Sequence, residues 1–166
     1  MKNLHTIGRN VKVDFIGHAS SIPAKIDTGA DSSSVWASNI RVDKTGHLSF
    51  TLFDKGSKYY TGEIITRKVF KVVVIKSSHG HQQLRYKIVL SIRIADKRIK
   101  ALFTLADRSS NTFPVLIGRR LLTNKFLIDV SKNEFPRPLS KLSDEMNEIM
   151  VRDPYRFYKK HIRKQR

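Results

Sequence analysis

The sequence predicts an all-β protein, a compact barrel or sandwich with one short helix after Gly118 and a basic, helical C-terminal tail. Short apolar segments with polar residues at alternating positions recur from Val11 to about Val130, as in half-buried strands. Turn-forming residues, for example at 54–57 and 77–80, separate these segments. No amphipathic helical pattern lies between them, and closely spaced strands of this kind are typical of a β-barrel or a β-sandwich.

The expected strands follow one another closely along the chain. Alternation of apolar and polar residues predicts one strand at 11–15 and another at 48–52. Between them, an apolar segment leads into Asp27. Segments rich in Val, Ile, Phe and Tyr predict further strands at 69–75, 86–94, 99–105, 113–117 and 126–130.

Two helices are expected after these strands. Arg119 opens a short helix that ends at Asn124. A longer helix begins near Ser140 or Ser143, because apolar residues recur there at helical spacing, and Pro154 ends it. The apolar residues of this second helix are Leu142, Met146, Ile149 and Met150.

Residues 1–138 are expected to form the barrel domain, and residues 139–166 a C-terminal helix with a basic tail. The last twelve residues, 155–166, carry six Lys or Arg and no acidic residue, interleaved with three aromatic residues. This tail either contacts nucleic acid or the ribosome, or is a solvated end without a partner.

The composition is strongly basic, with 32 Lys and Arg against 14 Asp and Glu and a formal net charge of +18. Such a charge attracts polyanions, whether nucleic acid, membrane headgroups or an acidic peptide. The sequence has no cysteine, which excludes disulfides, thiolate zinc sites and a cysteine nucleophile. No segment has the ~18 apolar residues of a membrane helix, and the polar N-terminus does not suit a signal peptide. A cytoplasmic protein without a membrane partner is therefore expected.

The most informative motif is Asp27-Thr28-Gly29, which follows an apolar strand and continues into Ala30 and Asp31. It places one carboxylate at a strand end, on a turn that glycine tolerates easily. The tripeptide alone also fits an ordinary strand-ending turn. A second motif favours a catalytic role: the apolar segment 113–117 stops at a glycine and a helix then opens with an arginine.

Together the two motifs resemble the retropepsins, the homodimeric aspartic proteases of retroviral type. Segments 76–88, 104–108, 114–122 and 126–130 further resemble a bacterial family of retropepsin-like aspartic endopeptidases whose members also carry the name ATP-dependent zinc protease. This resemblance covers about residues 8 to 132 and implies a closed retropepsin-like barrel of about six strands. The separation between the two motifs exceeds the retroviral one, and an extra hairpin at roughly 41 to 66 would account for it.

The resemblance implies hydrolysis of peptide bonds by two carboxylates that share one proton. The ionised carboxylate takes a proton from a bound water while the protonated one donates to the scissile carbonyl oxygen. This chain has a single Asp-Thr-Gly sequence, so a two-fold homodimer would have to bring Asp27 from two copies together.

The resemblance also gives roles to the residues around Asp27. Thr28 would hydrogen-bond across the two-fold axis, and Gly29 would let substrate approach the backbone. Ala30 and Asp31 would continue the loop on the substrate side. The carboxylate of Asp31 would form a bidentate pair with Arg119, which with Gly118 supports the loop; a surface Asp31 without a partner is the alternative.

Two further substrate contacts are expected by resemblance. Residues 77–83 align with the retropepsin flap, the hairpin that closes over substrate, and Gly80 would supply its bend. A plain hairpin turn is the alternative. Arg108 would bind a substrate carboxylate, or else form an ion pair with Asp107.

No cofactor or metal is expected. The sequence contains neither Gly-x-x-x-x-Gly-Lys-Ser/Thr nor His-Glu-x-x-His. The single histidine cluster, His79 and His81, suits an exposed loop tip better than a metal site.

Two functions follow from the sequence. The first is a homodimeric aspartic endopeptidase acting on a peptide or protein, with an acidic peptide suited to the basic surface. The second is an inactive retropepsin-like binding module that contacts RNA, the ribosome or an acidic peptide through its basic surface and tail.

Overall fold

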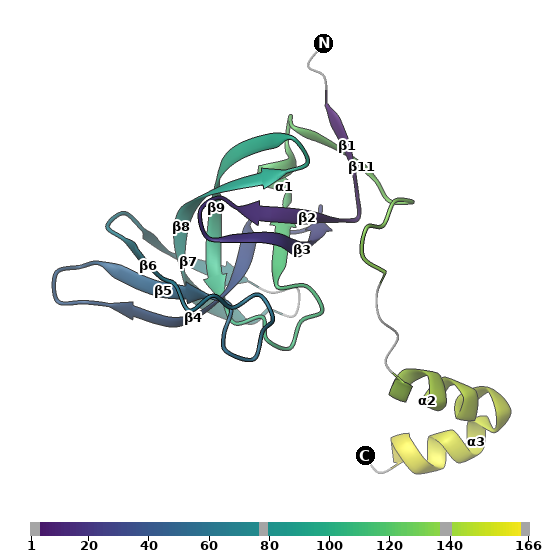
Figure 1. Cartoon of the computed structure of the whole chain (residues 1–166). Helices are drawn as coiled ribbons and strands as arrows, with labels where there is room; N and C mark the ends of the chain where they lie inside the picture. Colours follow the sequence, from purple (N-terminus) through teal and green to yellow (C-terminus); the bar gives the residue numbers. More distant parts are fainter. Residues whose placement is uncertain (1–3, 77–79, 137–140, 164–166) are drawn as a thin grey trace. The chain divides into compact units, whose positions relative to one another are not determined.

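The computed structural model describes residues 4–76, 80–136 and 141–163. The chain divides into two compact units, Met1–Phe135 and Pro136–Arg166. In the described residues, every strand lies in the first unit, and the second unit is helical (Figure 1).

Six strands of the first unit form a closed ring, which confirms the predicted all-β barrel (Figure 1). The ring closes because β10 pairs with β3 on one side and with β4 on the other. In ring order the strands are β10 (Val115–Gly118), β3 (Ala19–Asp27), β2 (Asn10–Phe15), β8 (Gln82–Ile94), β9 (Lys97–Ala106) and β4 (Ser33–Val42).

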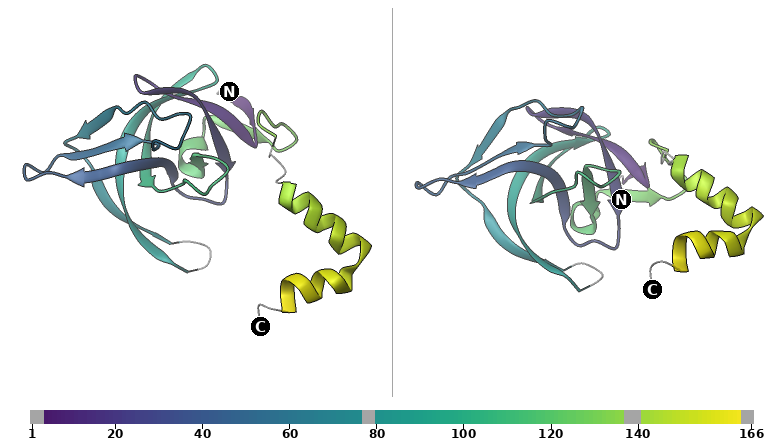
Figure 2. Two further views of the ribbon diagram at one scale, coloured as in Figure 1. Left: turned by 60° about the horizontal axis from the view of Figure 1, so that its bottom comes forward. Right: turned by 90° about the horizontal axis from the view of Figure 1, so that it is seen from below.

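Two antiparallel hairpins extend from this ring (Figure 2). In the first, β4 continues into β5 (Leu48–Leu52), which pairs with β6 (Ile64–Arg67). This extension occupies the place expected for an extra hairpin at 41–66. In the second, β7 (Lys71–Lys76) pairs with the first half of β8.

The ends of the first unit meet in a separate two-stranded sheet. There β1 (His5–Gly8) runs parallel to β11 (Phe126–Asp129). A single helical turn, α1 (Arg119–Leu122), links β10 to this sheet and confirms the short helix predicted after Gly118.

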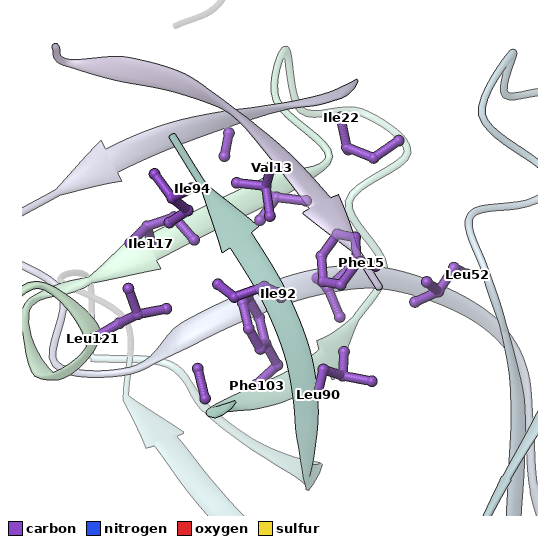
Figure 3. Packing of buried hydrophobic residues seen from close by; sticks show 14 of the residues in the cluster. Val13, Phe15, Ile22, Leu52, Leu90, Ile92, Ile94, Phe103, Ile117 and Leu121 are labelled. Atoms are coloured by element: carbon purple, nitrogen blue, oxygen red, sulfur yellow. The ribbon is translucent and has the colours of Figure 1, made fainter. Parts of the chain in front are cut away.

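The core fills the inside of the barrel (Figure 3). Along β8, buried residues alternate with exposed ones, as the two-residue period of a strand requires. The inward side chains of this strand are each at most 1% exposed: Ile88, Leu90, Ile92 and Ile94. Phe15 and Phe103 meet edge to face in this core, with ring centroids 5.6 Å apart.

Two strands were not expected from the sequence, and a third begins earlier than expected. β4 was not predicted, because its first three residues are all buried and show no alternation. β8 begins at Gln82, and the expected start at 86 is wrong, because its first three residues belong to the projecting hairpin and are exposed. β1 was not predicted either, since Ile7 is the only strongly apolar residue in its sequence, His-Thr-Ile-Gly.

The second unit contains α2 (Lys141–Arg152), α3 (Pro154–Phe157) and the five-residue π-helical segment Tyr158–Ile162. α2 ends before Pro154, as predicted. Pro154 also opens α3, where the Asp153 carboxylate accepts a hydrogen bond of 2.9 Å from the backbone N–H of Arg156. None of the helices in the described part of the chain is long and apolar enough to span a membrane.

Candidate active site

Asp27 is the last residue of β3, and its position follows from the closure of the ring. β10 lies between β3 and β4, and its last residue, Gly118, stands opposite Asp27. The short connection from β3 to β4 therefore has to cross the end of β10. We call this connection, residues 27–32, the Asp27 loop.

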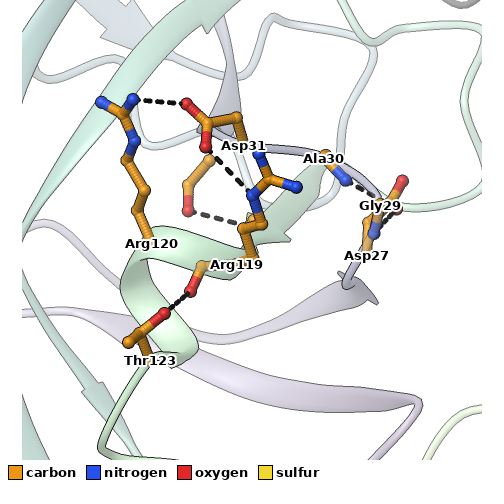
Figure 4. Close-up of polar contacts among 9 residues, drawn as sticks. Asp27, Gly29, Ala30, Asp31, Arg119, Arg120 and Thr123 are labelled. Carbon is orange, nitrogen blue, oxygen red and sulfur yellow. Dashed lines mark hydrogen bonds and ion pairs between the residues drawn. The ribbon is translucent and has the colours of Figure 1, made fainter.

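The Asp27 carboxylate is held by its own loop (Figure 4). Its Oδ1 atom accepts hydrogen bonds from the backbone N–H groups of Gly29 and Ala30, each 3.2 Å long. Within the described residues, Oδ2 has no hydrogen-bond donor. The side chain is half-buried. One oxygen is thus oriented by the backbone, while the other is available to share a proton with a second acid.

Gly118 allows the loop to pass close to β10. A Cβ atom at this position would lie 2.6 Å from the Ser32 carbonyl carbon and 2.9 Å from the Ala30 carbonyl oxygen, both in the main chain. The backbone N–H of Gly118 donates to Ser33 Oγ at 3.0 Å, and that of Arg119 donates to the Ala30 carbonyl at 2.8 Å. Any side chain at residue 118 would have to push the loop away.

Asp31 is paired with two arginines (Figure 4). Arg119 Nε donates to Oδ1 at 3.1 Å, and Arg120 Nη2 lies 2.7 Å from Oδ2. The sequence interpretation expected a bidentate link to Arg119 alone; instead each carboxylate oxygen takes a different arginine. Sequence reasoning missed Arg120, although its place beside Arg119 was a signal. With both oxygens occupied, Asp31 joins the loop to α1.

Thr28 and Gly29 are exposed at the outer side of the Asp27 loop. This position leaves them accessible to a second copy of the chain or to a substrate. Their predicted roles, bracing across a two-fold axis and approach of substrate, stay predictions. Ala30 is half-buried, and its backbone serves both Asp27 and Arg119.

Arg108 follows β9 and is half-buried. Its Nε donates to the Phe113 carbonyl at 3.1 Å, and its Nη1 donates to Ser34 Oγ at 3.3 Å. Among the described residues, no ion pair joins it to Asp107, whose carboxylate accepts from the backbone of Ser109 instead. The alternative role in such a pair is therefore wrong.

A second arginine lies near Arg108. Burial lowers the pKa of Arg108 most, repulsion from Arg85 lowers it further, and attraction to Asp27 raises it. Burial also lowers the pKa of Arg85, whose Nε donates to Gln83 Oε1 at 2.9 Å. Both guanidinium groups stay charged at neutral pH, since arginine titrates far above it. No sequence motif marks Arg85, because the antiparallel pairing of β8 with β9, which ends at Lys87 opposite Thr104, brings it toward Arg108.

The β7–β8 hairpin occupies the place of the predicted flap. Its two strands pair down to Lys76 opposite Gln82. Gly80 has a φ angle of +80°, a left-handed conformation that suits the predicted bend. Residues 77–79 of the expected flap, His79 included, lie outside the described residues. Across the part of the chain that the structure describes, no group of three His, Asp or Glu could hold a metal.

A six-stranded barrel that carries an Asp-Thr-Gly loop over a Gly-Arg strand end defines the retropepsin-like class. The model of one protein family, described as "Retropepsin-like aspartic endopeptidase RimB", matches residues 6–138. The chain therefore belongs to this RimB-like family.

Relatives and solved structures agree with this assignment. Proteins from Shewanella pealeana and Shewanella halifaxensis, both named "Probable alpha-L-glutamate ligase", are 34% identical over 116 residues, or 68% of this chain. The match spans 25% of either relative, about a quarter of its length. A crystal structure of a Legionella pneumophila protein of unknown function aligns with a TM-score of 0.61 at 26% identity, over 79% of this chain and 96% of that one.

Proposed function

We propose that this chain is an aspartic endopeptidase that works as a homodimer, with Asp27 from each copy in one active site. The observation that carries the proposal is the state of the Asp27 carboxylate. One oxygen is fixed by two backbone N–H groups, and the other has no donor among the described residues. A carboxylate with one free oxygen beside an exposed Thr-Gly turn is suited to meet its symmetry mate.

The proposed reaction needs two carboxylates that share one proton, because two negative charges a few ångströms apart do not both ionise cheaply. The ionised Asp27 takes a proton from water, whose oxygen attacks the scissile carbonyl carbon. The protonated Asp27 donates its proton to the carbonyl oxygen. Collapse of the tetrahedral intermediate breaks the C–N bond, and the amine leaves with a proton from the dyad.

The proposed substrate is an acidic peptide. Arg108 interacts electrostatically with Asp27, and Arg85 lies near Arg108, so two positive charges are available for carboxylates of a bound peptide. The net charge of +18 favours the same substrates. The relatives named as glutamate ligases are consistent with a substrate rich in glutamate.

The test compares the unmodified chain with Asp27→Asn and with Asp54→Asn, a control that changes an aspartate in another turn. Cleavage of a blocked octaglutamate peptide is followed by mass spectrometry, and folding by circular dichroism. Asp27→Asn is expected to abolish cleavage and to leave folding intact, while the control cleaves normally. Undiminished cleavage by Asp27→Asn would remove the proposal.

Mixing tests the shared site. If the dyad is built from two copies, an equal mixture of unmodified and Asp27→Asn chains at exchange equilibrium contains about a quarter of intact dimers. The activity is then about a quarter of that of the same total amount of unmodified chain. A value of one half would indicate that each copy acts alone.

The C-terminal tail supports a second candidate function, contact with RNA or the ribosome. Tyr155 and Tyr158 are exposed beside Lys159 and Lys160, so aromatic rings and cations are available together for bases and phosphates. Deletion of residues 155–166 is expected to remove salt-dependent binding of a single-stranded RNA. Equal binding by the shortened chain would reject this function.

A further inference from the structure

A cavity of about 220 Å³ lies beside β9, outside the Asp27 carboxylate site. We call it the edge pocket. Its walls come from β8, β9, α1, the turn that follows α1, and the two serines that precede or open β4. The lining residues are Ser32, Ser33, Lys87, Ile99, Lys100, Ala101, Leu102, Arg120, Leu121 and Lys125.

The edge pocket runs along an unpaired strand edge. Four consecutive residues of β9, 99–102, line it, although the side chains of a strand alternate between its two faces. The pocket therefore reaches the edge of the strand, and it also extends over one face, because Lys87 comes from β8 at the opposite edge. β9 pairs with β4 only from Phe103 onward, and no other described strand pairs with 99–102 on that side. An extended peptide has room to pair with the backbone there.

The edge pocket is strongly positive. Three lysines and one arginine line it: Lys87, Lys100, Lys125 and Arg120. Lys125 Nζ donates to the Thr123 carbonyl at 3.3 Å, and Arg120 pairs with Asp31. Among the described residues, no carboxylate pairs with any of the three lysines. Bound carboxylates would relieve the repulsion among these cations.

Aliphatic side chains form the rest of the pocket wall. Leu121 is buried, and Leu102 is 50% exposed. A bare inorganic anion leaves such surface uncovered, whereas glutamate side chains bring methylene groups that cover it. The open strand edge, the lysines and this aliphatic surface together favour a peptide over a phosphate.

We propose that the edge pocket binds an extended acidic peptide segment, which pairs with the open edge of β9 and places its carboxylates beside Lys87, Lys100 and Lys125. The proposal rests on the proposed function in taking this segment to be part of the substrate. Lys87 and Arg85 lie two residues apart on β8, and so on the same face of the strand. Cations thus continue from the Arg85–Arg108 pair to the edge pocket.

Binding is measured by fluorescence anisotropy on the full chain carrying Asp27→Asn, which prevents cleavage, with a labelled octaglutamate peptide at physiological salt. Adding Lys100→Gln and Lys125→Gln is expected to weaken binding by roughly two- to twenty-fold, as for two exposed ion pairs. The control, Lys44→Gln with Lys55→Gln, removes the same charge from exposed lysines outside the pocket. It is expected to change affinity by less than about twofold.

A peptide with every backbone amide N-methylated separates strand pairing from general attraction, because it keeps every carboxylate but has no N–H group to donate to a strand edge. It is expected to bind more weakly and to be insensitive to Lys100→Gln with Lys125→Gln. Three results would each overturn the proposal. The first is an equal loss of affinity in the Lys44→Gln, Lys55→Gln control, and the second is equal affinity for the methylated and the unmethylated peptide. The third is an oligonucleotide that displaces the labelled peptide more strongly than unlabelled octaglutamate does.

These outcomes are distinct from those of the catalytic test. If the peptide binds as expected but the unmodified chain does not cleave it, the endopeptidase proposal is rejected and the edge-pocket proposal stands. Cleavage by the unmodified chain together with unchanged binding in the Lys100→Gln, Lys125→Gln variant would remove the edge pocket alone.

Discussion

Gly118→Ala tests the close approach between β10 and the Asp27 loop with a single methyl group. The added carbon would lie 2.6 Å from Ser32 C and 2.7 Å from Ser32 O, far inside van der Waals contact, and the atoms it meets are main chain. Relief of such overpacking costs about 1–3 kcal/mol. Moving the loop away from the added methyl group also weakens the hydrogen bond from the residue 118 N–H to Ser33 Oγ, which contributes about 1 kcal/mol. We expect a total loss of about 2–4 kcal/mol in the free energy of unfolding.

The assay is urea denaturation with a parallel thermal scan. For a unit ending at Phe135, the expected loss corresponds to a fall in Tm of roughly 7–14 °C. Gly56→Ala is the matched control, because its added carbon would meet only the side-chain oxygen of Asp54, at 3.3 Å. We expect the control to change the free energy of unfolding by less than about 0.5 kcal/mol. If Gly118→Ala is no more destabilised than the control, the close approach does not govern this position.

Three further predictions concern charged groups. The backbone N–H of Ser21 and the Arg93 guanidinium lower the pKa of Asp14 in the folded chain. Its carboxylate therefore stabilises the fold above the unfolded pKa of about 3.9, and this stabilisation is lost as the pH falls through the lower folded pKa. Asp14→Asn should therefore cost about 1–2 kcal/mol at pH 7, and this cost should shrink as the pH falls below the unfolded pKa, by urea denaturation. Asp31→Asn should cost no more than about 1 kcal/mol in the same assay, because its carboxylate is 42% exposed. Arg85→Gln should raise KM for octaglutamate without changing KM for a neutral peptide; equal effects on both would contradict carboxylate binding.

The fold was predictable where burial alternates. The strand around Val13 and the core half of β8 show the two-residue period that a barrel wall imposes. β4 was not predictable in this way, since Ser33, Ser34 and Val35 are all buried. Ser33 and Ser34 are buried because they hydrogen-bond to Gly118 and Arg108, contacts between segments about 80 positions apart in the sequence.

The candidate site was likewise predictable only where its residues form local sequence motifs. The Asp27 turn and the glycine that ends β10 were visible as local motifs, since each needs particular residue types at neighbouring positions. Arg120 was signalled only by its place beside Arg119, where it pairs with Asp31, and Arg85 by no local motif, because tertiary pairing alone brings it to Arg108. The edge pocket likewise depends on where β4 begins to pair with β9, which no local pattern records.

The insertion of β10 between β3 and β4 also orders the events of biosynthesis. The Asp27 loop leaves the ribosome early, but the segment that supports it, Val115–Gly118, emerges nearly ninety residues later. Such distant pairing forms slowly, because a long stretch of chain has to be closed first. A nascent chain therefore carries its acidic turn without support until the barrel's other five strands have been translated, and it acquires a shaped site only after β10 has emerged.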